Sequence, residues 1–138
     1  TNRIVPGQFE ETYVLRAPFA GNTLTGDPEN FEILQDMAAA HPELTLGGPT
    51  LAWLGTALRE MSALASLPSP DLPCVTYLGT EENIVDPGRI KRRMANWPNG
   101  KLHILQGGRH EMLLDKPEVR DTMINGYTAL FDTFCDDT

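Results

Sequence analysis

The sequence predicts an α/β fold in which parallel strands alternate with helices. Residues 73–79 (PCVTYLG) form a short apolar and β-branched run that stops at Gly79 and is typical of a strand buried on both faces. Residues 101–106 (KLHILQ) predict the next strand, which Gly107-Gly108 ends. A helical pattern lies between the two runs, and a second helical pattern follows them. The order strand, helix, strand, helix implies parallel strands joined by a right-handed crossover.

The first half of the chain predicts two helices and few strands. Asp27 is a typical N-cap and Pro28 suits the first helical position, so we expect a helix from here until Pro42 ends it. A second helix is expected to start near Thr50, where apolar residues begin to recur at helical spacing. It ends before the proline-rich linker at 67–73.

The second half supplies the strands and two further helices. A helix is expected from Asp86 to about Trp97, with Asp86 as its N-cap. The Asn99-Gly100 dipeptide predicts the turn into the second strand. A long helix follows from Pro117.

The linker divides the chain into a helical segment, residues 1–70, and a segment with both strands, residues 71–138. Two parallel strands by themselves would leave their edges unpaired and an apolar face uncovered, which isolated domains avoid. We therefore expect these 138 residues to be stable only when they dock on a further part that completes the sheet.

Composition excludes several classes of partner. The 138 residues carry a formal net charge of −8, and the one dense basic run is residues 89–93 (RIKRR), so no nucleic-acid partner is expected. No run approaches the ~20 apolar residues that span a bilayer, so no stable membrane insertion is expected. Cys74 and Cys135 are too few for a disulfide scaffold or a zinc site, and both are interpreted as ordinary thiols.

Chemistry-bearing residues follow each strand. The loop after the first strand contains residues 80–83 (TEEN), and the loop after the second contains residues 107–111 (GGRHE). Parallel strands end at the same edge of a sheet, where open α/β sheets place their sites. A carboxylate and a histidine are therefore expected to meet there, as when an acid orients a general-base histidine.

A family resemblance covers nearly the whole chain. The stretches LPCVTYLGTEENIVDP and LHILQGGRHEMLLDKPEV resemble the C-terminal end of an α/β-hydrolase of the monoacylglycerol lipase and lysophospholipase type. Residues 12–70 are similar to the helical lid of bacterial members that resemble lysophospholipase L2. The resemblance implies the C-terminal part of an α/β-hydrolase fold, with a lid at 1–70 and the rest of the sheet absent from these residues.

The resemblance assigns the base and acid of a catalytic triad. His110 matches the base position in GGRHE, and Glu82 occupies the acid position, where the family usually has Asp. Asp86 is the alternative acid, although its place before Pro87 favours a helix N-cap. Glu81 is interpreted as a solvated surface residue.

The nucleophile is expected outside these residues. The motif Gly-x-Ser-x-Gly, which exposes a nucleophilic serine on a strand-to-helix turn, does not occur in the sequence. In this family the order is nucleophile, acid, base, so the resemblance implies a nucleophile in an N-terminal half that acts as partner to this segment. The segment alone is expected to be inactive.

The function implied is hydrolysis of a lipid carboxylic ester, with a lysophospholipid or a monoacylglycerol as substrate and no metal or organic cofactor. Leu51, Leu54 and Leu58 on the second helix are candidates for an acyl-chain pocket in the lid. Two alternatives stay open: an α/β-hydrolase of another bond type (esterase, peroxidase or dehalogenase), or a non-catalytic binding module on the same fold. A cytoplasmic or membrane-peripheral location is expected.

Overall fold

The structure is a computed structural model that describes residues 2–135, with side chains as far as Thr133. Seven helices and strands appear in this range: α1 (Tyr13–Arg16), α2 (Pro28–Ala40), α3 (Leu51–Ser66), β1 (Cys74–Gly79), α4 (Pro87–Ala95), β2 (Gly100–Leu105) and α5 (Pro117–Cys135). Two single-turn 3₁₀ helices lie at Pro42–Leu44 and Met112–Leu114. The side chain of Cys135, predicted as an ordinary thiol, falls outside the described side chains.

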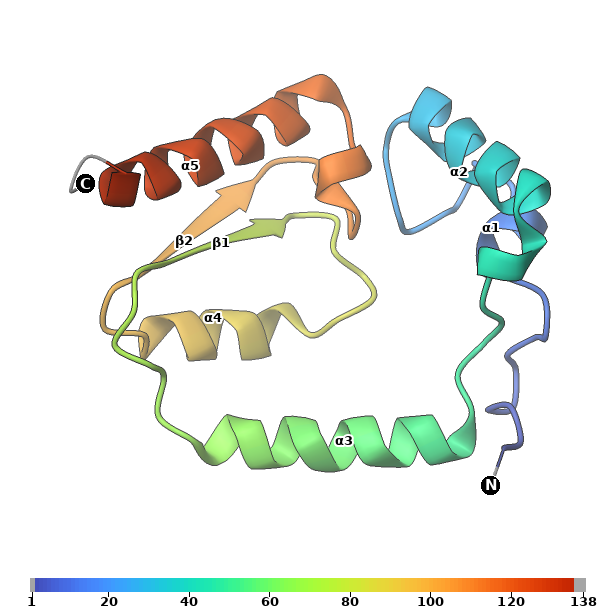
Figure 1. Ribbon diagram of the computed structural model, residues 1–138, viewed down its shortest axis with the longest axis horizontal. Coiled ribbons are helices and arrows are strands. Elements are labelled where there is room, and N and C mark those ends of the chain that lie inside the picture. Colours follow the sequence, from blue (N-terminus) through green and yellow to red (C-terminus); the bar gives the residue numbers. More distant parts are fainter. Residues whose placement is uncertain (1, 136–138) are drawn as a thin grey trace. The chain divides into compact units, whose positions relative to one another are not determined.

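The chain forms two compact units (Figure 1). The first contains the residues up to Asn22 together with Phe31–Leu67, and the second contains Thr23–Asn30 and the chain from Pro68 onward. The second unit is therefore discontinuous in sequence. The assignment of residues 1–70 to a lid and residues 71–138 to a hydrolase core stays a prediction.

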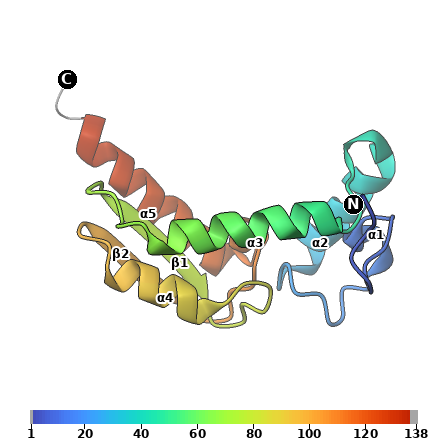
Figure 2. The same cartoon turned by 90° about the horizontal axis from the view of Figure 1, so that it is seen from below.

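A parallel pair of strands forms the centre of the second unit. β1 and β2 are aligned from Cys74 opposite Gly100 to Gly79 opposite Leu105. They lie side by side in Figures 1 and 2, and α4 forms the crossover between them. The predicted α/β architecture, with parallel strands and flanking helices, is confirmed in the described residues.

The two helices of this unit cover opposite faces of the strand pair. Successive side chains of a strand point to opposite faces. Thr76 of β1 contacts the sulfur of Met94 in α4, with its hydroxyl 3.2 Å away. The next residue, Tyr77, packs edge-on against Tyr127 of α5, with 5.2 Å between the ring centroids. α4 and α5 therefore sandwich the strands (Figure 1).

The core of this unit is small, and it is formed by side chains from β1 and from the two helices. The buried apolar residues here are Tyr77, Leu78, Met94, Val119 and Met123.

Capping side chains explain where three helices begin. Asp27 accepts the backbone N–H groups of Glu29 and Asn30 at the start of α2. Thr50 accepts the N–H group of Trp53 in α3. The Asp86 carboxylate accepts two N–H groups in the first turn of α4. These bonds satisfy backbone donors that the first turn of a helix leaves unpaired. The predicted helix starts are confirmed.

The first unit packs around one aromatic pair. Phe31 in α2 is 1% exposed, and its ring meets Phe19 edge-on at 5.8 Å. The side-chain amide of Gln35 donates to the carbonyl of Val14 and so ties α2 to α1. By contrast, α3, the long straight helix in Figure 2, has no buried residue. None of the described helices has the length and apolar content needed to cross a membrane.

Candidate catalytic site

Two loops meet at the carboxyl ends of the parallel strands. The N–H group of Thr80 donates to the carbonyl of Leu105 at 2.9 Å, and that of Glu81 donates to the carbonyl of Gly108 at 3.0 Å. The hydroxyl of Thr80 in turn accepts the N–H group of Gly107 at 2.8 Å. The hydrogen-bond ladder of the sheet therefore continues into the loops, and it fixes them next to each other.

Glycines allow this close approach. A Cβ atom on Gly79 would collide with the carbonyl group of Gly108, so no other residue fits at the end of β1 without moving a loop. Gly107 has φ +76°, a backbone conformation that residues with side chains rarely adopt. The glycines at the ends of both predicted strands thus have a steric role.

The acid and base candidates are in direct contact. Nδ1 of His110 lies 2.8 Å from Oε2 of Glu82. The Glu82 side chain is 6% exposed, whereas the His110 side chain is 30% exposed. The carboxylate is therefore enclosed, and the imidazole keeps an accessible side.

The environment of Glu82 favours its ionised form. Burial raises the pKa of this carboxyl, but hydrogen bonds from the N–H of Ile84, from His110 and from the N–H of Val85 outweigh burial, and the pKa is lowered from its usual value of 4.5. An ionised carboxylate can only accept hydrogen bonds. His110 must therefore carry a proton on Nδ1, which leaves Nε2 of the neutral ring as a proton acceptor.

The other acidic residues of these loops have different partners. Asp86 caps α4 through the N–H groups of Gly88 and Arg89, and its side chain is 55% exposed. Glu81 was expected to be solvated. It is half exposed, and it pairs with Arg109 at 3.1 Å. Of the carboxylates of Glu81, Glu82 and Asp86, the one that contacts the His110 ring in the structure is that of Glu82.

Comparison with known proteins gives a curated relative and a solved structure that resemble this chain. No protein-family model matches the chain. The probable lysophospholipase L2 of Haemophilus influenzae is 26% identical over 104 residues, which cover 75% of this chain and 33% of the relative. A soluble variant of monoglyceride lipase from Saccharomyces cerevisiae, solved in complex with a substrate analog, aligns with a TM-score of 0.69 and 17% identity. That alignment covers 91% of this chain and 43% of the solved one.

The chain has part of an α/β-hydrolase fold. The resemblance to the lysophospholipase and monoglyceride lipase type is confirmed over part of each protein. The chain spans about a third of the length of the curated relative and less than half of the solved structure.

The residues proposed for an acyl pocket lie on α3 of the first unit. Leu51 is 39% exposed and Leu58 is 53% exposed, while Leu54 is half-buried. None of these leucines lines the hollow at residues 7–49 or the hollow at residues 73–133, and their role in substrate binding stays a prediction.

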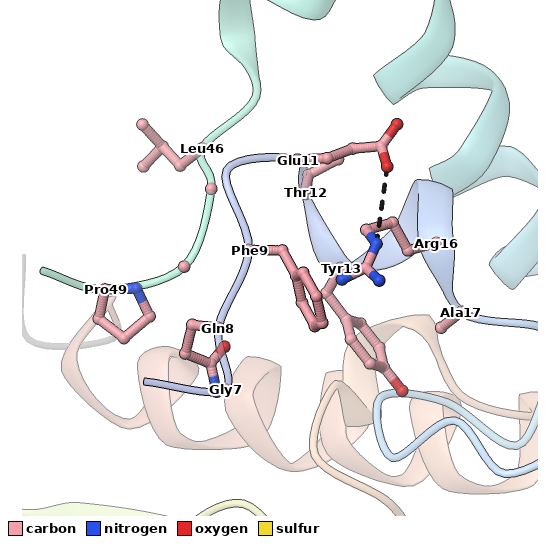
Figure 3. Close-up of a pocket in the computed structure, with 12 residues that line it drawn as sticks. Gly7, Gln8, Phe9, Glu11, Thr12, Tyr13, Arg16, Ala17, Leu46 and Pro49 are labelled. Atoms are coloured by element: carbon pink, nitrogen blue, oxygen red, sulfur yellow. Dashed lines mark ion pairs between the residues drawn. The ribbon is translucent and has the colours of Figure 1, made fainter. Parts of the chain in front are cut away.

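A hollow of about 570 Å³ occurs elsewhere in the first unit, between residues 7–17 and 46–49 (Figure 3). The guanidinium carbon of Arg16 lies 3.2 Å from the centre of the Phe9 ring, and Arg16 pairs with Glu11 at 3.7 Å. The hollow thus has an aromatic wall, and its arginine has a carboxylate partner.

The sequence pattern does not predict two polar residues that are completely buried. Asp115 and Thr25 are both fully buried. The Asp115 carboxylate accepts the N–H groups of Gly26, Arg109 and Lys116. Its place just before Lys116 and Pro117 resembles the Asp27-Pro28 start of α2, and this signal indicates an aspartate that binds backbone at a helix start. Nothing local in the sequence indicates its bond to Arg109.

Proposed function

We propose that the protein is a serine hydrolase of lipid carboxylic esters, with a lysophospholipid or a monoacylglycerol as substrate. The observation that carries the proposal is the 2.8 Å contact between His110 Nδ1 and the enclosed Glu82 carboxylate, at the carboxyl edge of two parallel strands. The names of both relatives, a lysophospholipase and a monoglyceride lipase, support the substrate class.

In the proposed mechanism His110 is the general base and Glu82 orients it. Nε2 of His110 takes the proton from the nucleophilic hydroxyl as that oxygen attacks the ester carbonyl. The same proton is then given to the leaving alcohol, and an acyl-enzyme remains. His110 then takes a proton from a water molecule as that water attacks the acyl carbonyl, and it returns the proton to the oxygen of the nucleophile as the fatty acid leaves. Glu82 stabilises the imidazolium ion that forms in each step.

The nucleophile is proposed to come from a part of the hydrolase outside these 138 residues. The sequence contains no Gly-x-Ser-x-Gly motif, and both relatives extend well beyond the aligned region. Ser66, for example, lies at the end of α3, where its hydroxyl donates to the carbonyl of Ala63. The 138 residues alone are therefore expected to be inactive.

The proposed enzyme requires no metal or organic cofactor. Residues 1–70 act as the lid in this proposal, and Leu51, Leu54 and Leu58 contact the acyl chain. A cytoplasmic or membrane-peripheral location agrees with an enzyme that approaches lipid without spanning the bilayer.

A fluorophosphonate probe tests the proposal on the complete gene product that carries these residues. The probe reacts with a serine that a histidine base activates. We expect labelling of the wild type, loss of labelling in His110→Ala, and release of fatty acid from a lysophospholipid or a monoacylglycerol. His41→Ala is the matched control, because His41 is exposed and its ring pairs with Glu43 in the other unit.

Two results would contradict the proposal. A folded wild-type protein that hydrolyses another bond without being labelled would indicate a different nucleophile, such as aspartate. A folded protein that is neither labelled nor active on lipid esters would indicate a non-catalytic module.

A further inference from the structure

Two neighbouring residue pairs connect the loops of the candidate site. Oε2 of Glu82 lies 2.8 Å from Nδ1 of His110, and Oε2 of Glu81 lies 3.1 Å from Nε of Arg109. Each pair joins one residue of the loop after β1 to one residue of the loop after β2. Because the residues are consecutive in both loops, the two pairs form adjacent links, and a shift of one loop would disturb both.

Arg109 is held more firmly than an ordinary surface arginine. Its Nη1 donates to the carbonyl of Thr25 at 2.9 Å, and its backbone N–H donates to the carboxylate of Asp115 at 2.9 Å. The side chain is 26% exposed. Thr25 and Asp115 are fully buried, so Arg109 is anchored to the interior of the second unit.

The two residues that follow Arg109 are also anchored through their backbone. The N–H group of His110 donates to the carbonyl of Thr23, and that of Glu111 donates to the carbonyl of Leu24 at 2.7 Å. These bonds fix the main chain of the loop that carries His110 (residues 107–111, the base-carrying loop) against the segment Thr23–Asn30. The loop that carries Glu82 (residues 80–83) is held to β2 and the base-carrying loop by the backbone bonds of Thr80 and Glu81, and the Glu81 side chain adds a further link.

Glu81 is also a potential competitor of Glu82. The two carboxylates are adjacent in sequence, and either one alone has the chemistry to accept a hydrogen bond from His110. The ion pair with Arg109 gives Glu81 another partner. It thereby leaves Glu82 as the acceptor at the imidazole.

We propose that Arg109 and Glu81 form a positioning pair that holds the loops at the carboxyl ends of β1 and β2 in the arrangement in which His110 meets Glu82. This inference rests on the proposed function for its effect on catalysis. A misplacement of about 1 Å at a reacting group can cost about a hundredfold in rate, so even a surface ion pair of small free energy matters here if it fixes geometry.

The experiment compares four variants of the complete gene product: Arg109→Met, Glu81→Ala, Glu81→Gln and Glu111→Ala. Glu81→Gln keeps an oxygen that can accept the hydrogen bond from Arg109. Glu111 is exposed and belongs to the loop that carries Arg109, so Glu111→Ala is the matched control for loss of a carboxylate at the site. Circular dichroism and thermal unfolding establish that each variant is folded.

Two measurements are made on each variant. The first is the proton NMR resonance of the hydrogen-bonded Nδ1–H of His110, identified by its loss in His110→Ala. The second is the steady-state kinetics of ester hydrolysis, from which kcat and KM are determined separately. We expect Arg109→Met and Glu81→Ala to shift or broaden the resonance and to lower kcat about tenfold, with KM within about twofold of the wild type. Glu81→Gln retains most of kcat, and Glu111→Ala matches the wild type.

The NMR measurement separates this inference from the proposed function. An unchanged resonance in folded Glu81→Ala overturns the positioning pair, even if the enzyme is an active hydrolase. A changed resonance in a protein without hydrolase activity supports the pair and contradicts the proposed function. If Arg109→Met does not fold, Glu81→Ala still decides, because the Glu81 side chain is half exposed.

Discussion

The buried carboxylate of Asp115 accepts the backbone N–H group of Arg109, the residue that precedes His110. Its other oxygen accepts the N–H groups of Gly26 and Lys116. One side chain therefore joins the loop that carries His110, the segment before α2 and the start of α5.

Substitution of Asp115 tests how much this connection stabilises the second unit. In Asp115→Asn one carboxylate oxygen becomes an NH₂ group, so at least one buried N–H group faces a donor instead of an acceptor. An unsatisfied buried group costs about 1–3 kcal/mol, and we expect the free energy of unfolding to fall by about that amount. Denaturant titration measures it. Asp121→Asn, on the exposed side of α5, is the control and should differ little from the wild type; equal midpoints for Asp115→Asn and the wild type would contradict the prediction.

Glu82 gives the stability of the protein a defined pH dependence. Its folded-state pKa lies below its usual value of 4.5, so the stabilisation by its ionised form is fully present above that value and is lost as pH falls through the lowered pKa. The difference in unfolding free energy between the wild type and Glu82→Gln should therefore shrink as pH decreases below about 4.5. Denaturant titrations of both proteins between pH 7 and pH 3 measure this difference in unfolding free energy. A difference that grows as pH falls below about 4.5 would contradict the prediction.

Stability and fluorophosphonate labelling together distinguish the helix-capping role of Asp86 from the proposed catalytic role of Glu82. Asp86→Ala removes the cap of α4, which should lower stability by about 1 kcal/mol, and it should leave fluorophosphonate labelling unchanged. Glu82→Ala should abolish most labelling, because it removes the partner of His110. Thermal unfolding and labelling rates measure the two effects. Retained labelling in Glu82→Ala with loss in Asp86→Ala would identify Asp86 as the acid.

Gly79 is expected to tolerate no side chain. In Gly79→Ala the new methyl group meets the carbonyl of Gly108, so either β1 or the base-carrying loop must move. We expect a loss of about 1–3 kcal/mol, the range of overpacking in a tight site. Gly55→Ala is the control, since the nearest atom to its Cβ is the end of the Arg59 side chain at 3.6 Å. On α3 this change should increase stability by up to about 1 kcal/mol. Equal denaturation midpoints for Gly79→Ala and the wild type would show that the loops can separate freely.

The sequence was sufficient for features that depend on neighbouring residues. Asp27, Thr50 and Asp86 bind backbone within three residues, so the starts of their helices could be predicted from local pattern alone. The order of strands and helices likewise led to the parallel pair. From that pair followed the expectation that a carboxylate and a histidine share one edge, and the structure places Glu82 beside His110.

Features that depend on distant residues could not be predicted in this way. Asp115 is buried because its partners include Gly26, which is 89 residues away in the sequence. Glu81 looked like a solvated neighbour of the acid, and only the folded position of Arg109 gives it a partner. The leucines of α3 show helical spacing, but that spacing alone does not indicate whether they bind substrate or pack against other parts of the protein.

The discontinuous second unit has a consequence for folding. Thr25 donates to the carbonyl of Leu114, again across 89 residues, so this part of the unit must wait for the closure of a long loop. During synthesis the segment Thr23–Asn30 emerges well before its partners, and native contacts of such high sequence separation slow folding. The backbone around His110 therefore reaches its final position only after residues 109–115 have been made and have bound the segment Thr23–Asn30.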